Sequence, residues 1–210
     1  SYGLDLMAAA VDMSAVLTEG LAKPRLELRQ LVHDLQRMCG APATCSKPVV
    51  AAVHGWCIGG GLDLIATCDL RLCSADAKFS LREARVAMVA DLGSLQRLPR
   101  IIGDAATREL ALTAKDVPAE RAQALGLVSQ VLEDRDALLA AARAEALAIA
   151  KLPPLVVRGV KQVLNYQDGK PVSDGLEYVA VWNAAFLQSE DLKEAFAAFM
   201  QRRDPEYKGE

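Results

Sequence analysis

Three carboxylic acids stand in apolar stretches of the chain where packing alone does not call for a charge. Asp63 lies two residues past a glycine triplet, Glu83 lies in residues 79–84, which read Phe-Ser-Leu-Arg-Glu-Ala, and Asp91 interrupts residues 86–92, which read Val-Ala-Met-Val-Ala-Asp-Leu. Apolar neighbours raise the pKa of a carboxyl group toward the range that is useful for proton transfer. The three acids are therefore candidates for general acid–base catalysis.

Each acid also has a purely structural explanation. Asp91 could cap the helix predicted to begin at Gly93, because short acidic side chains favour that position. Glu83 could form a surface ion pair with the arginine on either side of it. Asp63 could be a first-turn acid favoured by the dipole of its helix. The sequence alone leaves both kinds of explanation open.

The glycine triplet Gly59-Gly60-Gly61 lies between an apolar strand and a helix start. Glycine lets the backbone turn tightly and brings bare N–H groups close to a ligand, and a helix N-terminus adds unpaired donors. Such a turn can hold a phosphate or a developing oxyanion, although it can also be a tight turn without a function. The residues do not form G-x-G-x-x-G, and no Gly-Lys-Ser/Thr follows, so nucleotide-phosphate folds are disfavoured.

The hydrophobic pattern predicts the elements that position these residues. Strands are expected over residues 49–53, 69–74, 78–80 and 128–132, and helices over 5–18, 25–39, 62–67, 93–102, 105–112 and 119–125, with a turn-rich connector over 40–48. Only helices are expected afterwards, over 135–151, 154–166, 172–187 and 189–202. Because the strand at 49–53 is apolar throughout, it is expected to be buried in a parallel sheet. We therefore expect an α/β catalytic core over residues 1–134 and a helical region over residues 135–210.

The bulk composition excludes several classes of protein. The 210 residues are 52% hydrophobic and 24% charged, with a net charge of −3, so no basic surface for nucleic acid is expected. The five cysteines are an odd number without a Cys-x-x-Cys pair, which favours a reducing compartment and disfavours a metal site. The most apolar run, residues 49–66, contains His54 and Asp63, so no membrane insertion is expected. No targeting signal opens the chain, and we expect a bacterial cytoplasm, with an organelle left open.

Several short motifs, taken in order, resemble those of the crotonase (enoyl-CoA hydratase/isomerase) superfamily. They are His54-Gly55 with Gly59-Gly60-Gly61-Leu62-Asp63, Cys68-Asp69-Leu70-Arg71, Phe79-Ser80-x-x-Glu83, Gly93-x-x-x-Arg97-Leu98-Pro99, Gly126-Leu127-Val128 and Ser189-x-Asp191-x-x-Glu194. The resemblance runs from residue 1 to about residue 207. It implies a spiral of ββα units with C-terminal helices for trimerisation, a homotrimer or homohexamer, an acyl-CoA thioester as substrate, and no cofactor beyond the CoA of that substrate.

The same resemblance implies an oxyanion hole made of two backbone N–H groups, which fall at Tyr2 and Gly60. The neighbouring residues expected to bind the substrate are Gly3, Leu4, Asp5 and Gly61. Such donors stabilise the enolate that forms at the thioester carbonyl. Members of the family usually carry further strands before this first motif, so we expect residues to be missing ahead of it.

The set of Asp63, Glu83 and Asp91 is similar to that of the dienoyl-CoA isomerases of the superfamily, which act in the oxidation of unsaturated fatty acids. Their reaction removes a proton from C2 of a 3,5-dienoyl thioester and adds one at C6, four bonds away, which suits two separate carboxyl groups. The resemblance implies Glu83 as the base at C2, protonated Asp91 as the acid at C6, and Asp63 as a polar support. An apolar lining from Met88, Val89 and Leu92 would suit a reaction that consumes no water.

Two other functions stay open on the sequence. One is a 2-enoyl-CoA hydratase, in which the acids at positions 63 and 83 would hold and activate a water molecule. The other is a crotonase-fold protein that binds a CoA thioester without turning it over. The third acid, Asp91, favours the isomerase over the hydratase, and the presence of all three acids favours an enzyme over a binding protein.

Overall fold

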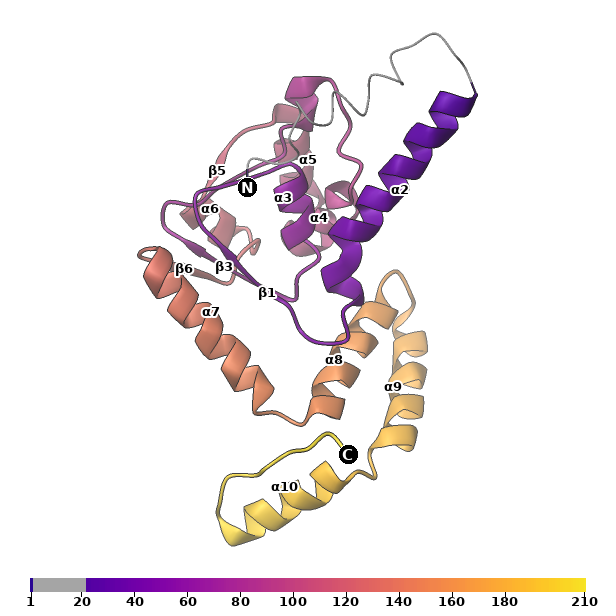
Figure 1. Ribbon diagram of the computed structural model, residues 1–210, viewed down its shortest axis with the longest axis vertical. Coiled ribbons are helices and arrows are strands. Elements are labelled where there is room, and N and C mark those ends of the chain that lie inside the picture. The colour runs from indigo at the N-terminus through magenta and orange to yellow at the C-terminus, as the bar shows by residue number, and fades with distance from the viewer. Residues whose placement is uncertain (2–21) are drawn as a thin grey trace. The chain divides into compact units, whose positions relative to one another are not determined.

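The computed structural model describes residue 1 and residues 22–210 (Figure 1). These residues form two compact units, one made of Ser1–Thr44 and Val49–Ala140 and the other of Cys45–Pro48 and Ala141–Glu210. The first unit contains the strands and the three candidate acids, and the second is helical. The helix predicted over residues 5–18 lies outside the described residues. No helix in the part that the structure describes is long and apolar enough to cross a membrane.

Two three-stranded sheets form the framework of the first unit. In one sheet, β1 (Val50–Val53), β3 (Leu70–Ser74) and β6 (Gln130–Leu132) are parallel and lie in the order β1-β3-β6. In the other, β2 (Trp56–Ile58) pairs in parallel with β4 (Lys78–Ser80), which pairs antiparallel with β5 (Val117–Pro118). The predicted parallel strand at residues 49–53 is thus confirmed as β1. The strands β2 and β5 were not predicted, because β2 lies between Gly55 and the glycine triplet and β5 ends in a proline, and glycine and proline indicate turns.

Between residues 22 and 130 of the described chain, six helical segments pack around these sheets. They are α2 (Lys23–Thr44), α3 (Gly60–Ile65), the 3₁₀ helix η2 (Glu83–Val86), α4 (Ser94–Ile102), α5 (Asp104–Thr113) and α6 (Ala119–Ala124). The core between helices and sheets contains the fully buried side chains of Leu72, Phe79, Leu98 and Leu127. Burying such large apolar side chains contributes about 1.5–3 kcal/mol each. This core positions α3, which contains Asp63, and α4, which follows the loop of Asp91.

Helix α2 continues to Thr44, so the prediction of a turn-rich connector from residue 40 was wrong. Gly40 and Pro42 were taken as helix breakers. A proline interrupts a helix by removing one N–H and by crowding the preceding turn. Pro42 lies so close to the end of α2 that only two helical residues follow it. The alanines at positions 41 and 43 favour the helical conformation, which lets the last turn form.

The four helices predicted after residue 134 are confirmed to within about two residues at each end. They are α7 (Arg135–Ala150), α8 (Pro154–Gln167), α9 (Val172–Phe186) and α10 (Glu190–Gln201). Prolines open α8 and α9, and Ser189 caps α10 by accepting a hydrogen bond from the N–H of Leu192 at 3.1 Å. Helix α7 begins in the first unit and ends in the second.

Candidate active site

The glycine triplet forms a tight turn between β2 and α3. Gly59 has φ 50° and ψ −118°, a conformation that residues with a side chain rarely adopt. Its N–H donates to the carbonyl of Ser80 at 3.0 Å, and its own carbonyl accepts from the N–H of Asp63 at 2.9 Å. A Cβ atom at position 59 would lie 2.7 Å from Oε1 of Glu83. Only glycine therefore permits both the turn and the close approach of the Glu83 carboxylate.

Residue 1 lies beside this turn. The N–H of Ile58 donates to the carbonyl of Ser1 at 3.1 Å, and a Cβ atom on Gly61 would come 3.1 Å from Cβ of Ser1. Among the residues that the structure describes, no acceptor is found for the N–H of Gly60 at the start of α3. Its role as an oxyanion donor stays a prediction, as do the roles of four residues that lie outside the described part, namely Tyr2, Gly3, Leu4 and Asp5.

Asp63 is a buried carboxylate, with 1% of its surface exposed. Its Oδ1 accepts two hydrogen bonds from Ser94, one from the backbone N–H at 2.6 Å and one from the hydroxyl group. Burial raises the pKa of Asp63, the two bonds from Ser94 act in the opposite direction, and the charge of Asp91 adds to the rise. Although Asp63 belongs to the first turn of α3, its carboxylate accepts a hydrogen bond from the first N–H group of α4.

Glu83 is half-buried and begins the 3₁₀ helix η2. Its Oε2 is buried and has no hydrogen-bond partner among the described residues. Burial raises the pKa of Glu83 above its ordinary value of 4.5, and the negative charges of Asp63 and Asp91 raise it further. A hydrogen bond from its own backbone N–H acts against this rise. A carboxylate with one unpartnered oxygen against the glycine turn is arranged to accept a proton from a ligand held there.

The alternative of a surface ion pair for Glu83 is wrong. The guanidinium of Arg82 instead bonds to Asp116, at 2.8 Å, and lies 4.7 Å from the ring centre of Trp56. No ion pair between Glu83 and Arg85 occurs in the described ranges. The basic neighbours thus leave the Glu83 carboxylate uncompensated.

Asp91 does not cap α4, so that alternative is also wrong. The N-cap position is Gly93, and no side chain on the preceding loop bonds to the helix. Asp91 is exposed, and its carbonyl accepts a hydrogen bond from Nε2 of Gln36 on α2 at 2.6 Å. This bond ties the loop before α4 to α2 and leaves the Asp91 carboxylate facing solvent.

The expected apolar lining around Asp91 is present only in part. Leu92 is buried and Met88 is half-buried, but Val89 is 76% exposed. Residues 87–93 form an irregular loop that begins at Ala87, whose φ is 58°. Because such a loop has no period, the sequence could not show which of its apolar side chains turn inward.

The three acids share one electrostatic neighbourhood, since Asp63 and Asp91 both act on the pKa of Glu83. Two further residues lie there: Ser94, which the sequence did not indicate, and Arg97, which the sequence showed only as part of a motif and without a role. The charge of Arg97 opposes the rise in the pKa of Asp63, and its guanidinium lies where a Cβ atom of residue 93 would be. The spacing Gly93-x-x-x-Arg97, one helical turn, is the signal that could have indicated this contact.

An open cavity of about 370 Å³ adjoins the glycine turn. Gly60 and Gly61 form part of its wall, and the rest is mainly apolar, with Leu35 and Met38 from α2, Leu64 from α3, and Leu92. A cavity of this size and composition suits the apolar part of a small acyl group. It places such a group next to the backbone of the predicted oxyanion donor.

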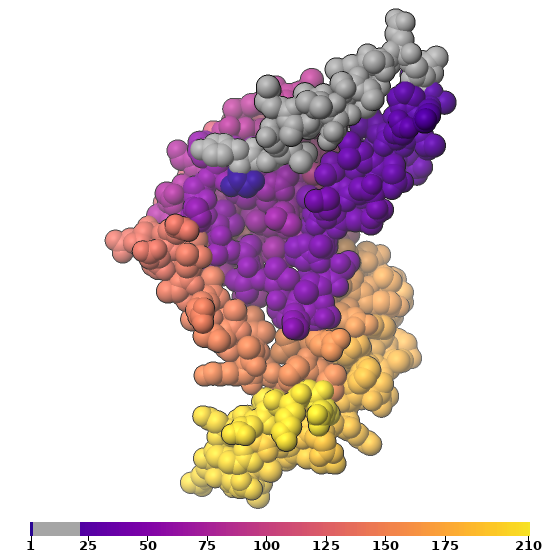
Figure 2. Space-filling model, viewed as in Figure 1, coloured from indigo at the N-terminus to yellow at the C-terminus, as the bar shows by residue number. Residues whose placement is uncertain are grey.

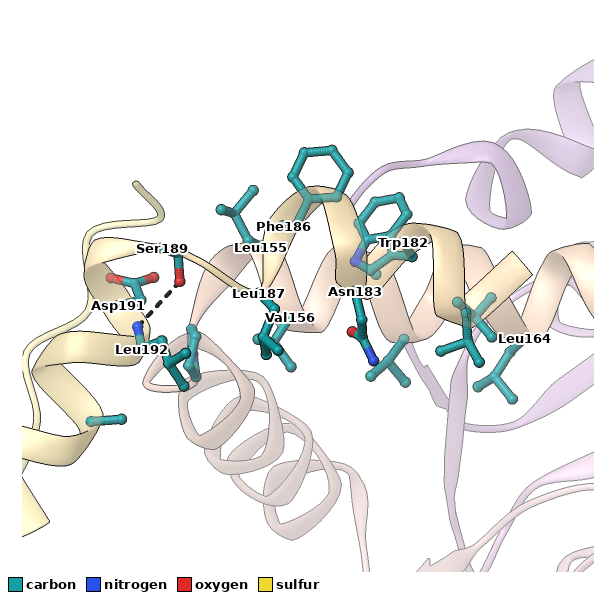
Figure 3. A pocket seen from close by; sticks show the side chains of 16 residues that line it. Leu155, Val156, Leu164, Trp182, Asn183, Phe186, Leu187, Ser189, Asp191 and Leu192 are labelled. Carbon is teal, nitrogen blue, oxygen red and sulfur yellow. Dashed lines mark hydrogen bonds between the residues drawn. The ribbon is translucent and has the colours of Figure 1, made fainter. Parts of the chain in front are cut away.

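A second cavity, of about 300 Å³, lies within the helical unit among α8, α9 and the start of α10 (Figure 3). Trp182, Phe186 and Val156 are among its apolar lining residues. The carboxylate of Asp191 at one end accepts hydrogen bonds from the N–H groups of Lys208 and Gly209, at 2.7 and 2.9 Å. That acid therefore anchors the C-terminal segment, and none of the predicted catalytic residues lines this cavity.

The chain is similar to several known proteins. The model of the enoyl-CoA hydratase/isomerase family matches residues 5–210. The mitochondrial Delta(3,5)-Delta(2,4)-dienoyl-CoA isomerase of Dictyostelium discoideum is 47% identical over 183 residues, which cover 87% of this chain and 62% of that protein. The peroxisomal protein of the same name from Arabidopsis thaliana is 48% identical over 181 residues, covering 86% and 65%.

A crystal structure of an enoyl-CoA hydratase from Bacillus anthracis superposes with a TM-score of 0.84 at 30% identity, covering 88% of this chain and 71% of that one. The chain spans 62–65% of the length of the two isomerases above. The predicted crotonase-like α/β fold is confirmed by these similarities. The chain belongs to the enoyl-CoA hydratase/isomerase family.

Proposed function

We propose that the protein is an isomerase that converts a 3,5-dienoyl-CoA into the 2,4-dienoyl-CoA. The observation that carries the proposal is the position of Glu83, a half-buried carboxylate whose Oε2 has no partner among the described residues, against the glycine turn and within the electrostatic influence of a second acid, Asp91. The similarity to two proteins named as dienoyl-CoA isomerases supports this choice of reaction.

In the first step, the glycine turn holds the thioester carbonyl and Glu83 removes a proton from C2. The electrons of the broken C–H bond move toward the carbonyl oxygen, which becomes an extended enolate. The N–H groups of Gly60 and Tyr2 donate to that oxygen, and each such donor typically contributes about 10²–10³ in rate. Because Glu83 has no cationic partner, its carboxylate retains the basicity that this transfer needs.

In the second step, Asp91 gives a proton to C6, and the double bonds settle at C2–C3 and C4–C5. In this proposal the bound acyl chain covers Asp91 and excludes water from the site. After each turnover Glu83 holds the proton from C2 and Asp91 has lost one, so a proton passes through solvent to restore the pair. The cycle consumes no water and uses no cofactor beyond the CoA of the substrate.

The proposal includes self-association as a homotrimer or homohexamer. Several large apolar side chains of α10 are exposed in the single chain, and the helix lies at the surface in Figure 2 (yellow). They are Phe196, Phe199 and Met200. An interface between copies would remove these side chains from water, which stabilises association by about 25 cal/mol per Å² of apolar surface.

The pH dependence follows from the raised pKa of Glu83. A base must be ionised to act, so kcat/KM is expected to fall as the pH drops through the pKa of Glu83 in the free enzyme. Since burial raises that pKa, the midpoint of the acid limb should lie above 4.5, the ordinary value for a glutamate. Initial rates between pH 4 and 8, with stability checked at each pH, measure the midpoint. A midpoint at or below 4.5 would contradict the role of Glu83 as a buried base.

The direct test is an ultraviolet assay of the purified protein with a 3,5-dienoyl-CoA, following the 2,4-dienoyl chromophore, with hydration of crotonyl-CoA measured beside it. The expected result is rapid growth of the chromophore with little hydration. Hydration without chromophore would favour a 2-enoyl-CoA hydratase, which the proximity of Asp63 and Glu83 would then explain. Tight binding of the thioester without either reaction would favour a binding protein.

A further inference from the structure

Asp63 and Ser94 form a buried pair that the proton transfers themselves do not use. Ser94 is fully buried, and both its backbone N–H and its hydroxyl group donate to the same oxygen, Oδ1 of Asp63. The two residues are 31 positions apart in the chain. A buried carboxylate needs such donors, because an uncompensated charge in the core is strongly unfavourable.

The pair joins α3 and α4, the two helices that begin next to the predicted oxyanion donor and the predicted acid. Asp63 belongs to α3, which begins at Gly60, the predicted oxyanion donor three residues earlier. Ser94 is the first residue of α4, and Asp91 precedes it by three residues. The negative charge of Asp63 at the N-terminus of α4 is favourable, since the first N–H groups of a helix are positive and unpaired. The contact therefore fixes the glycine turn relative to the loop that carries Asp91.

We infer that Ser94 is a positioning residue, which acts through Asp63 to hold Asp91 at the right distance from the glycine turn and Glu83. This inference rests on the proposed isomerase function. The hydroxyl group of Ser94 is the part of the pair that a mutation can remove, since its N–H belongs to the backbone. Without the hydroxyl group, Asp63 keeps only the hydrogen bond from the backbone N–H of Ser94, and the start of α4 loses one of its two hydrogen bonds to Asp63.

Loss of the Ser94 hydroxyl group should impair the proton transfer at Asp91 more than the transfer at Glu83. Glu83 is positioned by η2 and by its contact with Gly59, neither of which involves Ser94. Asp91 lies on the loop that leads directly into Ser94, and its other fixed contact is the bond from Gln36 to its carbonyl. Loosening the start of α4 should therefore displace the acid at C6 while leaving the base at C2 in place. A misplacement of about 1 Å can cost about 10²-fold in rate.

The test compares Ser94→Ala with Ser94→Thr, which keeps a hydroxyl group at the same position. In deuterated water, deuterium entering C2 of recovered substrate reports the step at Glu83, and formation of 2,4-dienoyl product reports the step at Asp91. For Ser94→Ala we expect kcat to fall about 10–100-fold with KM changed less than about threefold, and the ratio of C2 exchange to product to rise at least about tenfold. Ser94→Thr should restore both values to within about threefold of the original chain.

The outcomes separate this inference from the proposed function. If the unmodified protein does not form the 2,4-dienoyl product, the proposed function fails first. If it does, but Ser94→Ala leaves the exchange ratio unchanged or Ser94→Thr is as impaired as Ser94→Ala, the positioning role is overturned. A general loss of folding would lower exchange and product formation together. Should Ser94→Ala not fold, Ser94→Cys, whose thiol is a weak donor, provides the same comparison.

Discussion

Glu83→Gln is expected to lower kcat/KM for a 3,5-dienoyl-CoA by about 10³-fold or more, without loss of stability. The amide cannot accept the proton from C2, and general bases contribute about 10²–10⁴ in rate. In the same variant, deuterium from solvent should no longer enter C2 of the substrate, because no base remains to make the enolate. Steady-state chromophore assays and mass analysis of recovered substrate measure the two effects.

The expected stability of this variant distinguishes catalysis from structure. The Glu83 carboxylate is half-buried, its Oε2 has no partner among the described residues, and the charges of Asp63 and Asp91 disfavour it. A neutral amide of nearly the same shape removes that penalty, so the free energy of unfolding should stay the same or rise by about 1 kcal/mol. Glu120→Gln, on the exposed face of α6, is the matched control and should change neither quantity. A Glu83→Gln protein that is destabilised yet active would argue for a structural role.

The sequence indicated candidate site residues where a short run of neighbouring residues forms a recognisable motif. The glycine triplet and the acid two positions after it could be recognised because a strand, a turn and a helix start follow one another within fifteen residues. Most helices longer than about eight residues were located well, since their apolar side chains recur at a fixed spacing, but the last turn of α2 was not predicted. The strands β2 and β5 were overlooked because glycines flank β2 and β5 includes a proline.

The partners of the site residues could not be predicted, because they come from other parts of the chain. Ser94 reaches Asp63 across 31 positions, and Asp116 binds Arg82 across 34. The first directs Asp63 to the start of α4, and the second removes the arginine from Glu83. For Asp91 the local sequence was misleading. Its neighbours in the chain are apolar, yet the residue is exposed in the folded loop.

Asp91→Asn is expected to separate the two halves of the proposed reaction. Asparagine cannot supply a proton to C6, so formation of the 2,4-dienoyl product should fall by about 10²–10⁴-fold. Glu83 and the glycine turn are unchanged, so exchange of the C2 protons with deuterated water should continue at more than about one third of its original rate. The enolate still forms in this variant, but it can only return to the substrate. Product formation and C2 exchange, followed in the same sample, measure the two halves.

The position of Asp91 makes this separation a strong test. Its carboxylate is exposed and does not cap α4, so its replacement should leave the fold and its stability nearly unchanged. Asp136→Asn, which replaces another exposed acid in the first turn of α7, is the control for the loss of one negative charge. Normal product formation by Asp91→Asn would mean that C6 takes its proton from elsewhere, and would remove the reason to prefer an isomerase over a hydratase. Loss of exchange and of product together would instead show that Asp91 helps to form the enolate, so that the acids act as one coupled group rather than at two ends of the diene.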